Sequence, residues 1–384
     1  MRLTTIFLFF YTFLLLQSCT KVSKEDTNNS KVIKKLEIGY AKGFTVDYYP
    51  DYKLVRILES GFANKQVIEY ALIERGTPKP KNLPANAIPI EIPLQSIVCL
   101  STTYAPMLDE IGEIDKIVGF ADSKYSSLKS LQNQVKNGKI QEVGGQNGVT
   151  NTETIIQLEA NAIMTYSEKD YEKLTKLGQK VIVNTEYLEN SPLGRAEWIK
   201  LVAVFFNKEE IASKFFADVE NNYQTTKKEI AATTKNMPAQ QKPTIFGTIP
   251  YGNIWYMPAG KSFAATIWQD AGAEYAWQTT EGVGSLQISI EEVIAKAQKT
   301  TIWVNTGAFT SLQELIASDN RFANFLAVQK KQVYNCNKRV GEGGGNEFYE
   351  YGVIRPDIVL KDLARILYPN IYPNYELYFY QKLE

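Results

Sequence analysis

The pattern of apolar and polar positions changes several times along the chain. An apolar run covers Ile6 to Leu16 and gives way to a polar tract, Thr20 to Lys35, in which no apolar period recurs. Residues 36–75 alternate between apolar and polar side chains in short pieces, which is typical of strands in a meander or hairpin. Prolines punctuate residues 78–93 and indicate an extended connector. The pattern therefore predicts a strand-rich start to the folded chain.

From residue 96 onward, short apolar runs alternate with stretches of helical spacing. Residues 96–100 and 115–121 are expected to be strands on either side of a helix at 102–111. The same order recurs as a helix at 155–158, a strand at 162–165, a helix at 171–177 and a strand at 180–183. Strands that alternate with helices form βαβ units, so we expect a parallel sheet here.

Residues 209–235 carry the pattern of one long amphipathic helix. Neither Gly nor Pro interrupts this stretch, and at ~1.5 Å per residue it would be roughly 40 Å long. A second βα pattern runs from residue 243 to 369. The chain is therefore predicted to be an α/β protein with two lobes, each built on a parallel sheet and joined by the long helix. The apolar stripe of this helix consists of Ala212, Phe215, Phe216, Val219, Tyr223 and Ile230.

The apolar run near the N-terminus is too short for a bilayer span, which needs ~20 residues, and it fits the apolar core of a secretory signal. Leu16-Gln17-Ser18-Cys19 resembles the lipobox of bacterial lipoproteins, although Gln17 is larger than the usual residue there. The resemblance implies a signal peptide at 1–18, lipid on Cys19 and a flexible tether at 19–35. The protein would then lie in a bacterial periplasm or cell envelope, anchored to a membrane. An ordinary signal peptide with a chance cysteine is the alternative.

Histidine is absent from the chain. This removes Ser-His-Asp and Cys-His catalysis, zinc sites built on imidazole and imidazole ligation of haem, so a binding protein is favoured over an enzyme. Lys+Arg and Asp+Glu both number 42, and nothing indicates a nucleic-acid partner. Cys99 and Cys336 lie in apolar, strand-like stretches and are expected to be free buried thiols rather than a disulfide.

Four stretches carry a recognisable pattern: they begin with SIVCLSTTYAPMLDEIG at residue 96, TETIIQLEANAIMTY at 152, IWYMPAGKSFAATIWQDAGA at 254 and RPDIVLKDLARILYP at 355. Together they resemble one known family, the substrate-binding lipoproteins of ABC importers for vitamin B12, haem and iron–siderophore complexes. The resemblance covers residues 94–369 and implies two α/β lobes joined by one long helix, with the ligand in the cleft between them. The lobes would be residues 36–195 and 238–384, around connecting helices at 196–237. The chain departs from the family pattern at Ala160 and Asn161, where Pro-Asp would stand.

The resemblance also implies that each lobe presents one carboxylate to an arginine of a membrane permease. Glu153 and Glu291 stand at matching motif positions in the two lobes, and Glu292 is the neighbouring alternative to Glu291. Each could instead be an ordinary glutamate at a helix N-terminus, where the helix dipole stabilises a negative charge by ~0.3–1 kcal/mol.

The same mapping implies a set of ligand-binding residues in loops and at strand ends. Aromatic faces give much contact area at low entropy cost, and Arg339 could meet an anionic group of the ligand. Aromatic residues also fill cores, and Arg339 could be a solvated loop charge. Arg195 and Glu197 are interpreted as structural charges near the lobe hinge. The implied ligand-binding residues are Ser101, Thr102, Thr103, Tyr104, Gln146, Asn147, Tyr166, Trp255, Tyr256, Met257, Ser285 and Arg339.

The resemblance thus implies a monomeric receptor without cofactor or catalytic activity that hands its ligand to an ABC permease. A ferric siderophore or related iron complex is slightly favoured over cobalamin, because the C-terminal motif resembles the iron-complex branch of the family. Both are favoured over haem, which would need Tyr or Met ligation here. One alternative is a surface lipoprotein that captures ligand for a neighbouring outer-membrane system. Another is an envelope hydrolase that uses the carboxylate pairs Asp357 and Asp362, or Glu347 and Glu350.

Overall fold

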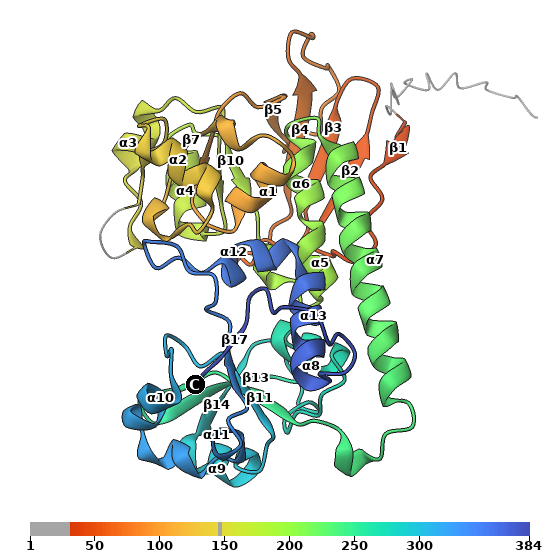
Figure 1. Ribbon diagram of the computed structural model, residues 1–384. Helices are drawn as coiled ribbons and strands as arrows, with labels where there is room; N and C mark the ends of the chain where they lie inside the picture. Colours follow the sequence, from red (N-terminus) through yellow and green to blue (C-terminus); the bar gives the residue numbers. More distant parts are fainter. Residues whose placement is uncertain (1–30, 145–147) are drawn as a thin grey trace, which may run out of the picture.

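Figure 1 shows the computed structural model of the chain, which describes residues 31–144 and 148–384. The expected signal peptide, Cys19, most of the expected tether, and Gln146 and Asn147 lie outside the described residues. The expected α/β class with parallel sheets and a long helix is present. Among the described helices, none is long and apolar enough to cross a membrane.

The first sheet along the chain is antiparallel, and it confirms the predicted meander. Its order is β1-β2-β3-β4-β5, and only the last pair is parallel. Alternating side chains such as Phe44, Val46 and Val55 bury one face in the main core. The strand β5 lies inside the proline-punctuated stretch, so the connector expected there contains a strand. The strands are β1 (Lys34–Lys35), β2 (Phe44–Tyr48), β3 (Lys53–Ile57), β4 (Ile68–Glu74) and β5 (Ile88–Ile92).

A parallel sheet of order β10-β9-β6-β7-β8 forms the centre of the upper lobe in Figure 1. Its inner strands are short apolar runs because both faces are covered, as in most parallel sheets. The strands are β6 (Ile97–Cys99), β7 (Ile117–Phe120), β8 (Gln141–Glu142), β9 (Ala162–Thr165) and β10 (Val181–Val183). The helices between them are α1 (Tyr104–Glu110), α2 (Lys129–Lys136), α3 (Thr152–Gln157) and α4 (Glu168–Lys176).

Three helices follow the parallel sheet, and the third confirms the predicted long helix. They are α5 (Pro192–Glu197), α6 (Ile199–Val204) and α7 (Glu209–Thr234). The 26 residues of α7 span about 39 Å at 1.5 Å each, and in Figure 1 the helix runs beside both lobes. Its buried side chains recur every three or four residues: Ala212, Phe216, Val219, Tyr223, Thr226 and Ile230.

The lower lobe contains two sheets. One has the order β11-β15-β16-β17, with β17 antiparallel, and the other is the antiparallel sheet β12-β13-β14. The strands are β11 (Ile245–Gly247), β12 (Pro250–Tyr251), β13 (Ile254–Pro258), β14 (Ser285–Ser289), β15 (Ile302–Val304), β16 (Val333–Asn335) and β17 (Gln381–Lys382). The helices are α8 (Phe263–Asp270), α9 (Ile290–Ala297), α10 (Leu312–Ser318) and α11 (Leu326–Gln329).

The chain then returns to the junction of the lobes through α12 (Glu347–Ile354) and α13 (Pro356–Leu367). Helix α12 packs against α1 and α5, while α13 packs along α7 (Figure 1). The hydroxyl of Tyr351 on α12 donates a hydrogen bond to Glu110 on α1 at 2.9 Å. The two lobes are therefore joined by packed helices at their junction as well as by α7.

Two buried carboxylates fix the segment between β1 and β2 to the helices at the lobe junction. Glu197 on α5 accepts hydrogen bonds of 2.7–2.9 Å from the backbone N–H groups of residues 39–41. It also pairs with Lys200 at 2.7 Å, and both side chains are buried. Glu189 accepts hydrogen bonds from the N–H groups of residues 42 and 43 and from the indole of Trp198. The N-terminal sheet is therefore tied to the helices that join the lobes.

We expect Glu197→Ala to lower the free energy of unfolding by about 3–5 kcal/mol, because Lys200 would stay buried without its partner. Urea denaturation measures this loss. Glu172→Ala is the matched control, since Glu172 forms an exposed pair with Lys176, and it should cost less than about 1 kcal/mol. A loss at Glu197 as small as that at Glu172 would contradict this role.

Candidate functional site

Polar and aromatic side chains gather where three neighbouring strands of the upper parallel sheet end. Open α/β sheets place their ligands at the carboxyl ends of strands. The hydroxyl of Thr103, after β6, donates a 2.7 Å hydrogen bond to Glu186, after β10, and lies 2.9 Å from the hydroxyl of Ser101. Tyr166, at the end of β9, stands edge-on to Tyr187 with ring centroids 5.7 Å apart. We call this set, Ser101, Thr103, Tyr166, Glu186 and Tyr187, the strand-end cluster.

The two tyrosines of the strand-end cluster present their rings to solvent. Tyr166 is 47% exposed and Tyr187 is 46% exposed. Exposed rings beside hydroxyl and carboxylate groups are the usual lining of a small-molecule site, which is mostly apolar with a few polar anchors. Of the residues expected from the sequence, the structure thus brings together Ser101, Thr103 and Tyr166. Thr102 lies half-buried in the same loop.

Glu186 is the buried acid of this cluster. Burial raises the pKa of its carboxyl, although the Thr103 hydrogen bond acts in the opposite direction. Its second oxygen, Oε2, is buried and has no hydrogen-bond partner among the described residues. Because this oxygen is itself buried, a ligand would reach it only after the side chains that cover it move. The sequence analysis missed Glu186 and Tyr187. They come shortly after the strand at 181–183, just as Tyr166 comes directly after the strand at 162–165, so the same rule would have found them.

Arg195 connects the upper lobe to the lower one. Its guanidinium lies 4.1 Å from the ring centroid of Phe263, the first residue of α8, and donates to the carbonyl of Tyr187. Burial lowers the pKa of Arg195, and its Nε has no hydrogen-bond partner among the described residues. These contacts fit the structural charge near the hinge that was expected from the sequence. They also bring a cation close to the strand-end cluster.

A pocket of about 520 Å³ lies between the lobes at another part of the junction. Its walls are the segment 126–136 of the upper lobe and the segment 338–347 of the lower one. Arg339 lines it, pairs with Glu347 at 2.7 Å and stacks over the ring of Tyr378 at 4.2 Å. The lining has four cations, Lys129, Lys136, Lys338 and Arg339, against the two acids Glu342 and Glu347. Three of these cations form ion pairs, Lys136 with Glu342, Lys338 with Glu376 and Arg339 with Glu347, so Lys129 is the lining cation without an ion pair among the described residues.

Tyr104, Trp255 and Met257 are corrections to the expected ligand set, because all three side chains are completely buried. The hydroxyl of Tyr104 donates to the carbonyl of Asn184 at 2.8 Å. The indole of Trp255 donates to Gly247, and its ring lies 5.7 Å from that of Trp303 in the lower core. A buried side chain offers no surface to a ligand, so packing explains these residues.

Two further expected residues, Tyr256 and Ser285, are exposed on the antiparallel pair β13 and β14 of the lower lobe. Tyr256 points away from the core because side chains alternate along a strand, and its neighbours Trp255 and Met257 point inward. Neither residue belongs to the strand-end cluster or lines the 520 Å³ pocket.

Glu153 and Glu291 are exposed and stand in the first turns of α3 and α9. Glu291 is 76% exposed along its side chain and lies 3.4 Å from Arg321, while Glu292 pairs with Lys296. In Figure 1, α3 and α9 belong to different lobes, and both lie on the side away from α7. Each lobe therefore presents one of the two expected carboxylates to solvent.

The cysteines match the expectation of free buried thiols. Burial raises the pKa of Cys336 to about 11 and raises that of Cys99 further. Within the described ranges, no group of three or more His, Cys, Asp or Glu side chains could hold a metal ion.

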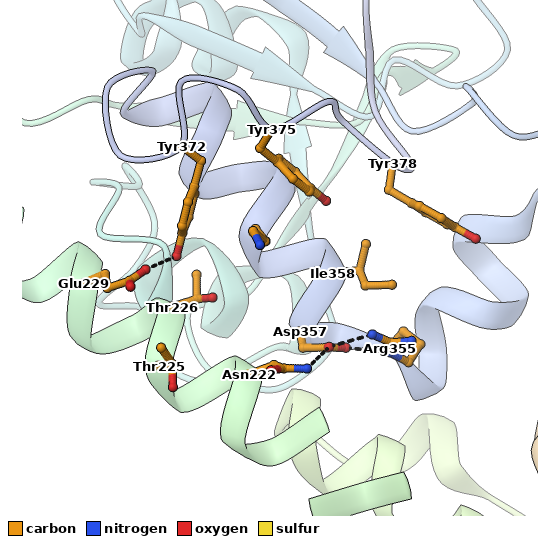
Figure 2. Close-up of a pocket in the computed structure, with 11 residues that line it drawn as sticks. Asn222, Thr225, Thr226, Glu229, Arg355, Asp357, Ile358, Tyr372, Tyr375 and Tyr378 are labelled. Carbon is orange, nitrogen blue, oxygen red and sulfur yellow. Dashed lines mark hydrogen bonds and ion pairs between the residues drawn. The ribbon is translucent and has the colours of Figure 1, made fainter. Parts of the chain in front are cut away.

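A second pocket, of about 350 Å³, lies between α7, α13 and the segment 372–378 (Figure 2). The guanidinium of Arg355 donates two hydrogen bonds of 2.9 Å to the carboxylate of Asp357. Asp362, on the same helix α13 as Asp357, accepts hydrogen bonds from the hydroxyl of Tyr375 and from three backbone N–H groups. Structural donors thus occupy both carboxylates that a hydrolase would need here.

The other carboxylate pair considered for a hydrolase, Glu347 and Glu350, is also engaged. Glu347 binds Arg339 and the hydroxyl of Tyr378. Glu350, on α12, accepts hydrogen bonds of 3.0–3.2 Å from the hydroxyls of Ser126 and Ser127 and from the Ser127 N–H. Next to it, a Cβ on Gly343 or Gly345 would come within 1.8 or 1.6 Å of a backbone oxygen of residue 124 or 125. We call this contact between lobes, Glu350 with the loop 341–345 on residues 124–127, the interlobe latch.

Comparison with known proteins agrees with this architecture. A protein-family model described as periplasmic binding protein matches residues 97–340. An uncharacterized lipoprotein of Methanocaldococcus jannaschii is 26% identical over 387 aligned residues, which cover 94% of this chain and 88% of that protein.

Solved structures of low sequence identity share the fold. A periplasmic haem-binding protein of Pseudomonas aeruginosa has a TM-score of 0.56 at 15% identity, covering 76% of this chain and 98% of that one. A molybdate-binding periplasmic protein of Haemophilus influenzae has a TM-score of 0.54 at 15% identity, covering 74% and 89%. Proteins of this fold therefore bind ligands of very different size.

The interlobe latch predicts a pH dependence of stability. Burial raises the pKa of Glu350 from 4.5 to about 7, so the folded chain holds this proton more tightly than the unfolded chain does. The resulting stabilisation is complete below about pH 4.5 and is lost as the pH rises through about 7. We expect it to amount to at most about 3 kcal/mol.

Urea denaturation from pH 4 to 8 measures this effect as the difference between the wild type and Glu350→Gln. The difference should change across this window, whereas Asp218→Asn on the exposed face of α7 should follow the wild type. A Glu350→Gln profile parallel to that of the wild type would show that this proton does not contribute.

Proposed function

The chain belongs to the periplasmic binding protein family, the solute-binding proteins of ABC importers, and we propose that it captures a metal chelate or corrinoid for delivery to an ABC permease. The strand-end cluster is the observation that carries the proposal. It combines two exposed aromatic rings, two hydroxyls and a buried carboxylate oxygen that has no hydrogen-bond partner among the described residues, at the carboxyl ends of parallel strands. Arg195 and Phe263 place the lower lobe next to it.

The ligand class follows from what the chain can and cannot supply. A chelator fills the coordination sphere of its metal, so a chain without histidine needs to provide only shape, hydrogen bonds and charge. Tyr166 and Tyr187 suit a large flat ligand, and Glu186 suits a hydrogen-bond donor on it. A ferric siderophore or related iron complex is our first candidate, cobalamin the second and haem the third. Arg339 would meet an anionic substituent that reaches into the pocket beside it.

We further propose a membrane anchor and a docking pair. Lipid on Cys19 would hold the receptor at the envelope surface, and the lipoprotein relative in Methanocaldococcus jannaschii supports this anchor. Glu153 and Glu291 would bind arginines on the two halves of the permease, because each stands exposed on its own lobe. The lobes would be residues 36–195 and 238–384, with connecting helices at 196–237, and the receptor would act as a monomer. The second candidate function keeps the anchor and the ligand site but delivers to a neighbouring outer-membrane system.

Ligand binding tests the first part of the proposal. We expect the chain from residue 20 onward to bind one class among ferric siderophores, cyanocobalamin and haemin in isothermal titration calorimetry. Tyr166→Ala and Tyr187→Ala should each weaken that binding about 5- to 30-fold, as expected for the loss of an aromatic contact of about 1–2 kcal/mol. Tyr251→Ala, at the exposed end of β12, is the control and should bind as the wild type does. Binding that is unchanged in both cluster variants would place the ligand elsewhere.

Uptake by cells tests the docking pair. We expect the double variant Glu153→Lys, Glu291→Lys to bind ligand normally in solution but to lower ligand uptake at least about tenfold, because like charges would face each other at the permease. The control is the double variant Glu210→Lys, Asp218→Lys on α7, which changes the net charge equally. Uptake equal to that of the control variant would favour the second candidate function, in which the receptor does not bind an ABC permease.

A further inference from the structure

The N-terminal sheet β1–β5 precedes the residues that the family model matches, and its outer end has no role in the proposed ligand site. The turn between β2 and β3 and the connection from β4 to β5 meet there around a shallow hollow of about 480 Å³. In Figure 1 these two loops rise at the top of the upper lobe, and the described chain enters beside them. The hydrogen bond from the N–H of Ile33 to Tyr48 attaches the entering chain to the same end of the sheet.

This end of the sheet carries an excess of free positive charge. Lys31, Lys34, Lys79 and Lys81 are exposed, and none forms an ion pair with any part of the chain that the structure describes. The nearby charges Lys53 and Arg75 are neutralised by Glu209 and Glu91. The opposing acids are Asp51, in the turn between β2 and β3, and Glu74, which also lines the hollow and accepts hydrogen bonds from Asn207.

Aromatic and apolar side chains lie between these lysines. Tyr48 and Tyr49 line the hollow together with Lys79 and Lys81, and the ammonium of Lys34 lies 5.5 Å from the ring centroid of Tyr48. Tyr49 stacks on Tyr52 at 4.6 Å. The side chain of Ile33, beside Lys34, is 67% exposed. We call the set Lys31, Lys34, Lys79, Lys81, Tyr48 and Tyr49 the lysine–tyrosine tip.

We propose that the lysine–tyrosine tip docks on the surface of an anionic lipid bilayer. Lysines at an anionic membrane surface contribute ~1 kcal/mol each, and tyrosines prefer the headgroup region.

The position of the chain outside the structure supports the choice of a bilayer as the partner. This step rests on the lipid anchor proposed at Cys19. The 12 residues from 20 to 31 can span at most about 40 Å, so an anchored chain holds the tip within that distance of the membrane. The tip is thus the part of the described fold that the anchor keeps nearest to lipid.

Docking by the tip and docking by Glu153 and Glu291 require different orientations. In Figure 1 the N-terminal sheet lies on the α7 side of the upper lobe, whereas α3 and α9 lie on the other side. Binding through a few exposed lysines is weak and sensitive to salt, so it permits exchange between the two positions. The tip would then hold the receptor, with or without ligand, on the bilayer while it is not bound to the permease.

Vesicle cosedimentation of residues 20–384 tests the tip without the lipid or the apolar run, since all contacts described above lie within residues 31–384. The vesicles are phosphatidylcholine with about one third phosphatidylglycerol, or phosphatidylcholine alone. We expect at least about tenfold more protein on the anionic vesicles, and loss of that difference at about 0.5 M NaCl.

The variant in which Lys31, Lys34, Lys79 and Lys81 are all changed to Gln should lose binding to the anionic vesicles at least tenfold. The matched control changes four exposed lysines elsewhere, Lys169, Lys173, Lys299 and Lys330, to Gln and should bind as the wild type does. Equal urea midpoints for both variants establish that they fold.

No binding by the wild type, equal binding to neutral vesicles, or equal loss in the two variants would overturn the proposal. None of these outcomes depends on ligand or permease. A failure here would therefore leave the ligand titration and the uptake test to judge the proposed function separately.

Discussion

The relation between the two lobes depends on the interlobe latch. Glu350 comes from α12, late in the chain, and its carboxylate is held by hydroxyl and N–H donors of Ser126 and Ser127 in the upper lobe. Beside it, Gly343 and Gly345 let two backbones approach more closely than any side chain would permit. A buried carboxylate is tolerated only while its donors stay in place, so this contact favours one arrangement of the lobes. A ligand that changes the spacing of the lobes must either break the contacts of the interlobe latch or move parts of the lobes that the latch does not hold.

The latch and the N-terminal segment act on the same group of helices. Helix α12 packs on α5, and α5 carries Glu197, which holds residues 39–41. The N-terminal sheet, the loops of the strand-end cluster and the return from the lower lobe thus meet at one helix. Because these contacts are buried charges with several donors, they are directional and leave little freedom for slippage. The result is a rigid support for the loops that end β6, β9 and β10.

Most of the architecture could be predicted from the sequence, because the relevant signals are local. The apolar stripe of α7 and the apolar runs of β6, β7, β9 and β10 depend only on spacing, and each lies where the pattern indicated. The strand-end rule likewise identified Ser101, Thr103 and Tyr166. Applied once more, to the polar run after residue 183, it would have found Glu186 and Tyr187. The sequence could not show that the side chains of Trp255 and Met257 point inward, because this depends on which face of β13 packs on the core of the lower lobe. Nor could the partner of Glu350, which lies more than 200 residues away in the sequence.

The central claim is that the junction between the lobes receives a ligand at the strand-end cluster. A crystal structure of the chain with the chelate that it binds tests this claim most directly. We expect the ligand to lie between the lobes, in contact with the rings of Tyr166 and Tyr187 and with a donor group on the free oxygen of Glu186. A ligand seated in the pocket of Figure 2, or anywhere else away from the strand-end cluster, would contradict the claim.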